Sequence, residues 1–107
     1  MTKTKASTTK IHGIDFDNIE QTVSFNGVAC DLNKIEYKVL LAIAHANSRS
    51  EDLPHDEVVN RTKAQSDTSG SQVIMNIRRK LADKGLQITI DTVSNPNSVK
   101  RYKIRFN

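Results

Sequence analysis

Apolar and polar residues alternate along the first third of the chain. The alternation runs through residues 14–16 and 23–25, and the pair Asn26-Gly27 follows directly. Both residues of an Asn-Gly pair tolerate positive φ, so the pair predicts a two-residue turn that leads into a further strand at residues 28–30. A period of two with such a turn predicts an antiparallel sheet at the N-terminus.

The pattern changes to a helical one after this sheet. Asn33 is followed three residues later by Glu36, which is the spacing of a capping box and predicts a helix that begins at Asn33. Apolar residues between 35 and 44 cover nearly the whole circumference of this helix, so we expect it to be central and buried. The polar run 47–50 ends it.

Two more helices are predicted in the middle of the chain. The shorter one opens at Leu53-Pro54, because Pro favours the first helical position and the acidic pair at 56–57 favours the positive end of the helix dipole. The polar residues 63–69 end it. The longer helix begins near residue 69 or 70 and runs to Lys84, with Gly85 suited to the left-handed position after a helix.

The C-terminal part of the chain predicts a hairpin. Residues 88–90 alternate as in a strand, residues 94–98 form a turn, and residues 101–106 alternate again. One face of the last strand is apolar, whereas the other is wholly cationic and carries Arg101, Lys103 and Arg105. The fold class expected from these elements is α+β.

Composition places these elements in one domain with an aliphatic core. The chain has 107 residues, 5% of them aromatic and none of them Trp. We expect residues 1–10 to be a disordered basic arm and residues 11–107 to form the domain. No apolar run approaches the roughly 18 residues of a membrane span, and the N-terminus lacks the apolar stretch of a signal peptide, so a cytoplasmic protein without a membrane partner is expected. Cys30, the single cysteine, is expected to be a buried thiol.

Charge is distributed unevenly along the chain. Residues 1–10 carry three lysines and no acid, residues 11–60 carry three basic and nine acidic residues, and residues 61–107 carry ten basic and three acidic residues. A protein with this polarity presents its C-terminal half to a polyanion and keeps the acidic half away from it. The charge pattern therefore favours binding to nucleic acid.

The main candidate element for binding nucleic acid is the third helix. At about 100° per residue, Gly70, Ile74, Ile77 and Leu81 form its buried stripe. Its opposite side presents Gln72, Asn76 and Arg79, flanked by Ser69 and Lys80. Asn and Gln can pair with adenine and Arg with guanine, although a solvated helix face explains these residues equally well. The cationic hairpin that follows favours DNA, because phosphate contacts need cations beside the reading helix.

The order of the elements and several segments resemble the effector domain of OmpR/PhoB-type response regulators. The segments are Leu32-Asn33-Lys34-Ile35-Glu36, Val73-Ile74-Met75-Asn76-Ile77-Arg78-Arg79-Lys80-Leu81, Ile90-Asp91-Thr92-Val93 and Arg101-Tyr102-Lys103-Ile104. The resemblance covers roughly residues 14–106. It implies a winged helix-turn-helix with an N-terminal antiparallel sheet, three helices and a C-terminal hairpin wing.

The resemblance also implies roles for particular residues. The family's base-reading positions fall on Ser71, Gln72 and Asn76. Its phosphate-binding arginine falls on Arg78, and its backbone-contacting threonine before the wing falls on Thr92. Because the family often has Arg at the position of Asn76, the sequence preference of this protein should differ from that of typical members.

Two segments depart from the family pattern. The family's Gly-x-Gly before the wing tyrosine is replaced by a longer and more basic segment, 95–101, so Lys100 and Arg101 are expected at the minor groove or the DNA backbone. The loop between the second and third helices lacks the family's Trp-Gly, so the resemblance leaves contact with RNA polymerase open. No receiver domain precedes the matched region, so control by phosphorylation is not implied.

No pattern in the chain predicts an enzyme. The three histidines, His12, His45 and His55, lie in different segments, so we expect no catalytic residues, metal or cofactor.

The expected function is sequence-specific binding of double-stranded DNA, as a small transcription regulator or nucleoprotein component of a bacterium or mobile element. The alternative is a winged helix that acts as a protein–protein adaptor or as an antagonist of another regulator. One helix reads few base pairs, so a homo-oligomer on repeated half-sites is expected.

Overall fold

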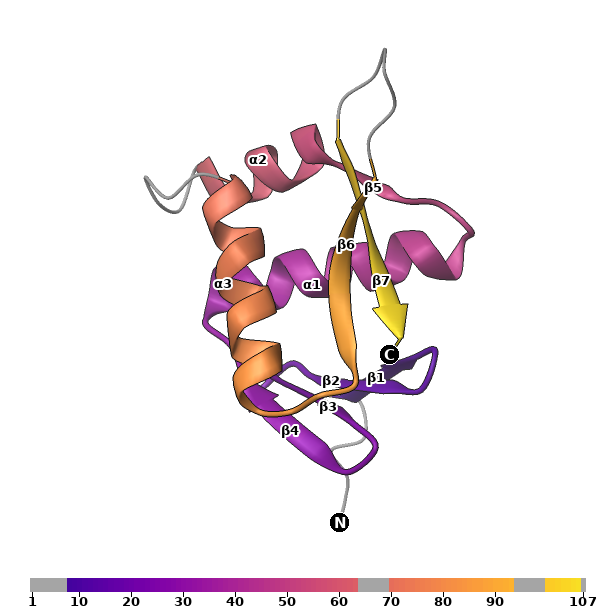
Figure 1. Cartoon of the computed structure of the whole chain (residues 1–107), viewed down its shortest axis with the longest axis vertical. Helices are drawn as coiled ribbons and strands as arrows, with labels where there is room; N and C mark the ends of the chain where they lie inside the picture. The colour runs from indigo at the N-terminus through magenta and orange to yellow at the C-terminus, as the bar shows by residue number, and fades with distance from the viewer. Residues whose placement is uncertain (1–7, 64–69, 94–99, 107) are drawn as a thin grey trace.

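The computed structural model of the chain describes residues 8–63, 70–93 and 100–106, with the side chains of 61–63, 70 and 71 left out of the description. It is a mixed α+β fold with a four-stranded antiparallel sheet, three helices and a second sheet of three strands (Figure 1). The expected α+β class, the N-terminal sheet, the three helices and the C-terminal pair of strands are therefore confirmed. No helix within the described part of the chain is long and apolar enough to cross a membrane.

The N-terminal sheet is a simple meander. Its strands, in spatial and sequence order, are β1 (Thr8–Ile11), β2 (Ile14–Asp17), β3 (Thr22–Phe25) and β4 (Val28–Asp31). Asn26 and Gly27 have φ of 53° and 82°, so the Asn-Gly pair forms the predicted tight turn between β3 and β4. Val23 lies opposite Cys30, and both side chains point into the core.

The first strand begins inside the segment that was expected to be a disordered arm. Ile11 pairs with Ile14 across a tight turn formed by His12 and Gly13, whose φ values are 50° and 84°. The side chain of Ile11 is buried, and its burial stabilises the added strand. The first described strand therefore begins at Thr8 rather than at residue 11. Pairing with β2 supplies the hydrogen bonds of this strand, and the polar composition of residues 8–10 does not indicate that pairing. The rest of the predicted arm, residues 1–7, lies outside the described residues.

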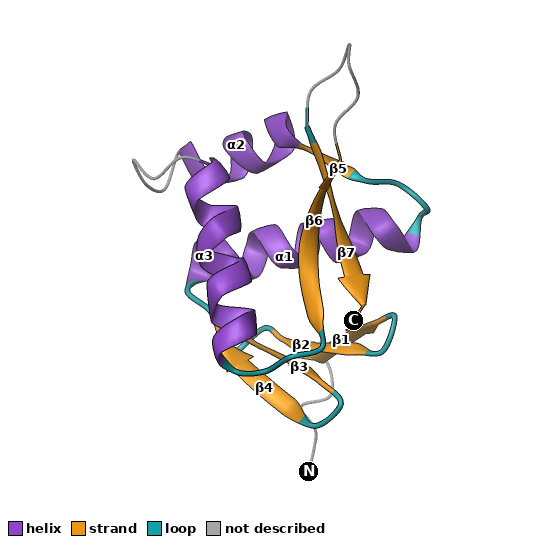
Figure 2. Ribbon diagram, viewed as in Figure 1, coloured by secondary structure: helices purple, strands orange, loops and turns teal. Residues whose placement is uncertain are grey.

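Helix α1 (Lys34–Ser48) is the central element of the fold, as predicted. It contacts β1, β5 and β7 as well as both other helices, so it links the two sheets (Figure 2). The capping box is present: the Asn33 side chain accepts a hydrogen bond from the Glu36 amide at 2.8 Å, and the Glu36 carboxylate accepts one from the Asn33 amide at 3.0 Å. The helix ends within the polar run 47–50, as predicted, and Arg49 is its C-cap.

The segment Leu53-Pro54 is a strand, and the prediction that it opens the second helix is wrong. Strand β5 (Leu53–Pro54) pairs with β7, with Leu53 opposite Tyr102. Pro54 is tolerated because β5 is an edge strand, where a missing backbone donor leaves no gap in the ladder. Helix α2 (His55–Lys63) begins one residue later, and the His55 amide donates to the Lys100 carbonyl at 2.8 Å.

Helix α3 (Gly70–Asp83) ends as the sequence predicts. Gly85 has φ of 76°, and its amide donates to the Ala82 carbonyl at 3.0 Å. The Leu86 amide donates to the Leu81 carbonyl, also at 3.0 Å, which completes a Schellman motif. This tight reversal sends the chain back along α3 as the next strand.

The second sheet has the order β5-β7-β6, where β6 is Ile88–Val93 and β7 is Arg101–Phe106. Strand β6 runs beside α3 and contacts it (Figure 1). The predicted turn at residues 94–98 lies outside the described residues. The fold therefore brings the third helix and the C-terminal pair of strands together along their lengths.

Candidate nucleic-acid interface

The outward side of α3 is polar and the inward side is apolar. Val73, Ile74, Ile77 and Leu81 are buried against the core, as the helical periodicity predicts for the last three. Gln72 and Arg79 are exposed, and Met75 is 50% exposed. Of the other predicted contact residues, Ser69 lies outside the described residues, and the side chain of Ser71 is not described.

Asn76 occupies a different place from the one that the periodicity predicts. It is partly buried rather than at the centre of the exposed face, which is formed by Gln72, Met75 and Arg79. The Gln72 amide nitrogen donates to the Asn76 side-chain oxygen at 3.0 Å. This bond aligns two amide groups on one side of α3, where each can both donate and accept.

Arg78 joins α3 to the second sheet. Its Nε donates to the Ile90 carbonyl at 2.7 Å, and its Nη2 donates to the Thr92 hydroxyl at 2.6 Å. These two bonds use part of a planar group that has five N–H donors, so further donors remain for an anion. Two residues that sequence analysis assigned to separate phosphate and backbone contacts are thus in direct contact with each other.

A surface hollow of about 170 Å³ lies between α3 and the second sheet. Its lining comes from three elements: Ile74, Met75 and Arg78 from α3, Thr92 from β6, and Lys100 and Tyr102 at the start of β7. The apolar residues form one part of the lining, and a guanidinium, an ammonium group and a hydroxyl form the rest. This combination of donors and positive charge suits an oxyanion such as a phosphate.

The outward face of β7 is cationic, as the alternation predicts. Arg101 and Lys103 on this face are exposed, and so is Lys100, which directly precedes β7. Arg105 differs from them, because its Nε lies 3.3 Å from a carboxylate oxygen of Asp91 and forms an ion pair across the sheet. Of these exposed cations, Lys100 lines the hollow, whereas Arg101 and Lys103 lie on the opposite face of β7 from Tyr102.

Lys80 does not extend freely from the flank of α3, where sequence analysis placed a DNA contact. Its Nζ lies 2.6 Å from Oε1 of Glu36, a residue that is only 3% exposed. The helical periodicity placed Lys80 on the outer flank correctly, but it could not reveal that the first turn of α1 brings a carboxylate within reach. Lys80 therefore binds to the protein itself in this structure.

One contact that supports the site was missed by sequence analysis. His55 is half-buried, and its Nδ1 lies 2.8 Å from the hydroxyl of Tyr102. Tyr102 lines the hollow, so His55 braces β7 from the side of α2. The two residues are 47 positions apart, and no local pattern in the sequence indicates their contact.

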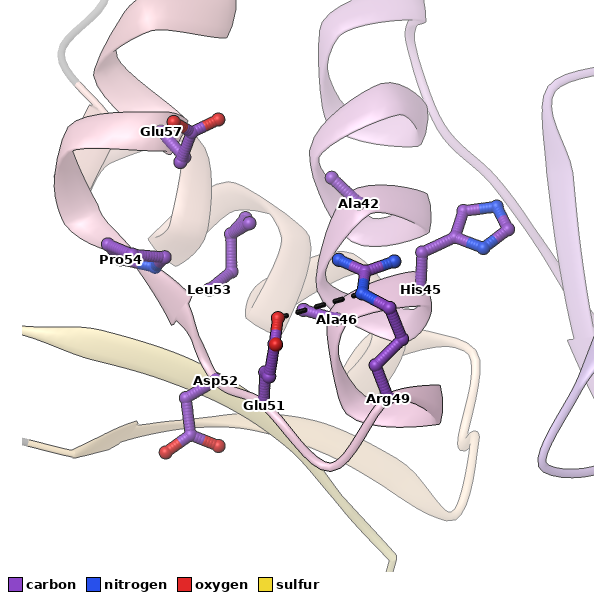
Figure 3. A pocket seen from close by; sticks show the side chains of 9 residues that line it. All are labelled: Ala42, His45, Ala46, Arg49, Glu51, Asp52, Leu53, Pro54 and Glu57. Carbon is purple, nitrogen blue, oxygen red and sulfur yellow. Dashed lines mark ion pairs between the residues drawn. The ribbon is translucent and has the colours of Figure 1, made fainter.

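A larger hollow, of about 440 Å³, lies between the end of α1, β5 and the start of α2 (Figure 3). Its lining includes three acidic residues, Glu51, Asp52 and Glu57, and the Glu51 carboxylate lies 3.6 Å from Nε of Arg49. Its three carboxylates outnumber the Arg49 guanidinium, so this hollow suits a polyanion less well than the hollow beside α3 does.

The cysteine is buried, as expected, and its side chain lies on the core-facing side of β4. Burial raises the pKa of the Cys30 thiol above its ordinary value of 9.0, although Lys80 and Lys84 act in the opposite direction. The thiol is therefore protonated at neutral pH and is a poor nucleophile. No cluster of three or more metal-ligating side chains occurs in the part of the chain that the structure describes.

No protein-family model matches the chain, and no curated protein is similar to it.

Proposed function

We propose that this protein binds double-stranded DNA in a sequence-specific manner as a winged helix-turn-helix protein. In this proposal α2 and α3 form the helix-turn-helix, and β6 and β7 form the wing. The observation that carries the proposal is the position of Arg78, Thr92 and Lys100 at one hollow beside the exposed polar side of α3. Groups suited to binding phosphates therefore lie next to the helix whose outward side carries groups suited to reading bases.

The proposed mechanism assigns these groups to the two grooves. Helix α3 enters the major groove, where Gln72, Asn76 and Arg79 contact base edges. Arg78 and Lys100 bind the phosphates along the groove wall, and the wing, with Arg101, contacts the minor groove or the backbone.

We propose the role of a small transcription regulator or nucleoprotein component of the OmpR/PhoB type. A single helix reads few base pairs, so useful affinity needs two or more copies on repeated half-sites. Contact with RNA polymerase is not part of the proposal.

A protein–protein adaptor is the second candidate, and one observation favours it. Met75 is 50% exposed at the hollow, where it could anchor a partner's apolar side chain. A protein-binding face usually carries several aromatic or aliphatic anchors, whereas the other exposed residues described on α3 are polar or, in Ala82, small. The DNA proposal therefore explains more of the residues on this surface than the adaptor proposal does.

Fluorescence anisotropy with labelled duplexes tests the proposal. A duplex of random sequence should bind with an affinity that falls steeply between 50 and 200 mM salt, because several phosphates are neutralised. Selection from a random-sequence library should then enrich a defined motif. Affinity that does not change with salt, or selection that enriches no motif, would contradict sequence-specific DNA binding and favour the adaptor.

A further inference from the structure

Glu36 is the charged residue that the fold buries, among those whose exposure the structure describes. Its Oε1 accepts two hydrogen bonds, one from the Asn33 amide at 3.0 Å and one from Nζ of Lys80 at 2.6 Å. The first bond belongs to the capping box of α1. The second bond comes from α3, 44 residues further along the chain.

A buried carboxylate needs this second bond. An ionised carboxylate that has been removed from water is costly unless a cation or several donors compensate for it. Lys80 supplies both the charge and a donor, while its side chain is still 41% exposed. The lysine side chain therefore runs along the surface of α3 toward α1 and ends at the buried carboxylate.

Lys80 begins at a position from which a lysine could otherwise reach DNA. It follows Arg79, which is exposed at the centre of the outward side of α3, and it comes one helical turn after Asn76. Lysines on the flank of a base-reading helix commonly bind phosphates, and such contacts strengthen binding to every sequence alike. The bond to Glu36 occupies the ammonium group that would make this contact.

We propose that Glu36 withholds Lys80 from DNA and thereby limits the sequence-independent affinity of the protein. This inference rests on the proposed DNA-binding function. Glu36 acts here as a positioning residue, because it touches Lys80 and not the DNA. Its effect is to keep one cation out of the set that binds phosphates, which leaves a larger share of the contacts to the base-reading side chains.

The test is the variant Glu36→Gln, measured with a labelled duplex of random sequence. Gln can still accept the Asn33 amide bond, so the capping box is kept, but a neutral amide no longer requires an ammonium group. Release of Lys80 to a phosphate should steepen the slope of log affinity against log salt by about 0.9. This corresponds to roughly threefold more affinity lost between 50 and 200 mM salt than in the wild type.

The matched control is Asp31→Asn, which also removes one negative charge. Asp31 is exposed on β4 and accepts a bond from the Thr22 hydroxyl at 3.3 Å, so its loss leaves the pair of Glu36 and Lys80 intact. This control should keep the wild-type slope. Equal slopes for Glu36→Gln and Asp31→Asn would overturn the inference.

Two Lys80 variants complete the test. In Glu36→Gln/Lys80→Met the slope should return to the wild-type value, because the released ammonium group is gone. Lys80→Met alone should lower the thermal midpoint, since the buried carboxylate loses its partner, and should leave the slope unchanged. A shallower slope for Lys80→Met would overturn the inference, because Lys80 would then already bind DNA in the wild type. If the wild-type protein shows no salt-dependent binding to DNA, the proposed DNA-binding function itself fails. If the wild type binds DNA and Glu36→Gln has the same slope as Asp31→Asn, only the inference about Glu36 and Lys80 fails.

Discussion

Nη2 of Arg78 lies 2.6 Å from the hydroxyl of Thr92, so one side chain of α3 is held by β6. The same guanidinium also binds the Ile90 carbonyl, which fixes its plane. A guanidinium that is already held in place loses little conformational freedom when it binds a phosphate. The contact between Arg78 and Thr92 thus contributes both to the packing of α3 against β6 and to the proposed binding of phosphates.

Substitution Arg78→Ala should affect folding and DNA binding together. The Ile90 carbonyl loses its donor in a partly buried place, which should cost about 1–2 kcal/mol of the free energy of unfolding. Affinity for cognate and random duplexes should fall by a similar factor, because a phosphate contact is lost. Urea unfolding and anisotropy titrations measure the two effects.

The matched variant is Thr92→Val, which removes the hydroxyl and keeps the branched shape. It should weaken DNA binding less than Arg78→Ala does, because Arg78 retains its bond to Ile90. Equal losses of affinity in the two variants would mean that the hydroxyl, rather than the guanidinium, is the essential phosphate contact.

Asn76→Ala should change sequence discrimination. An Asn or Gln that pairs with adenine contributes about 1–3 kcal/mol of discrimination, so the ratio of cognate to random affinity should fall by roughly 5- to 150-fold. Competition between the selected duplex and a scrambled one measures this ratio. Because Gln72 donates to Asn76, the double variant with Gln72→Ala should lose less than the sum of the two single losses. If the ratio stays at the wild-type value in Asn76→Ala, base reading belongs to Arg79 at the centre of the exposed side.

Replacing Lys100 and Arg101 with Ala should weaken binding to all sequences alike. Both side chains are exposed at the start of β7, and the bond from His55 to Lys100 uses only backbone atoms, so folding should be unaffected. The salt slope should become shallower by about two units if each residue binds one phosphate. Arg105→Ala is the control, because Arg105 is paired with Asp91, and it should leave the slope unchanged. A double variant that behaves like this control would show that the two cations are merely solvated.

Stability should fall in alkaline solution. Burial raises the pKa of the Cys30 thiol above 9.0, and burial together with the Asp17 charge raises the pKa of the Tyr37 hydroxyl above 10.0. The folded state therefore keeps protons that the unfolded state releases, so the free energy of unfolding is constant below about pH 8 and decreases as pH rises through these values. Urea midpoints between pH 7 and 11 should show the decrease.

Two variants divide this alkaline effect between the groups. Cys30→Ala should remove the part of the decrease that begins near pH 9. Tyr37→Phe should remove the later part, although it also loses the 2.6 Å bond from the Tyr37 hydroxyl to the Asn18 side chain and so starts from a lower stability. A wild-type midpoint that is level up to pH 11 would contradict the assignment.

Local rules of the backbone made several elements predictable from the sequence alone. The turn at Asn26-Gly27, the capping box of Asn33 and Glu36, and the Schellman motif at Gly85 depend on residues within a few positions of one another. The apolar stripe of α3 and the cationic alternation of β7 follow from periodicity in the same way. These features determine which side chains α3 and β7 can present.

Only the tertiary structure decided which of those side chains remain available to a ligand. Lys80 binds Glu36, Arg78 binds Thr92 and His55 binds Tyr102, across separations of 44, 14 and 47 residues. Leu53-Pro54 became a strand for the same reason, since its partner is β7 near the end of the chain. Helix caps and turns involve neighbours within about four residues, whereas strand pairs and buried ion pairs depend on how the helices and the two sheets pack, which no local pattern specifies.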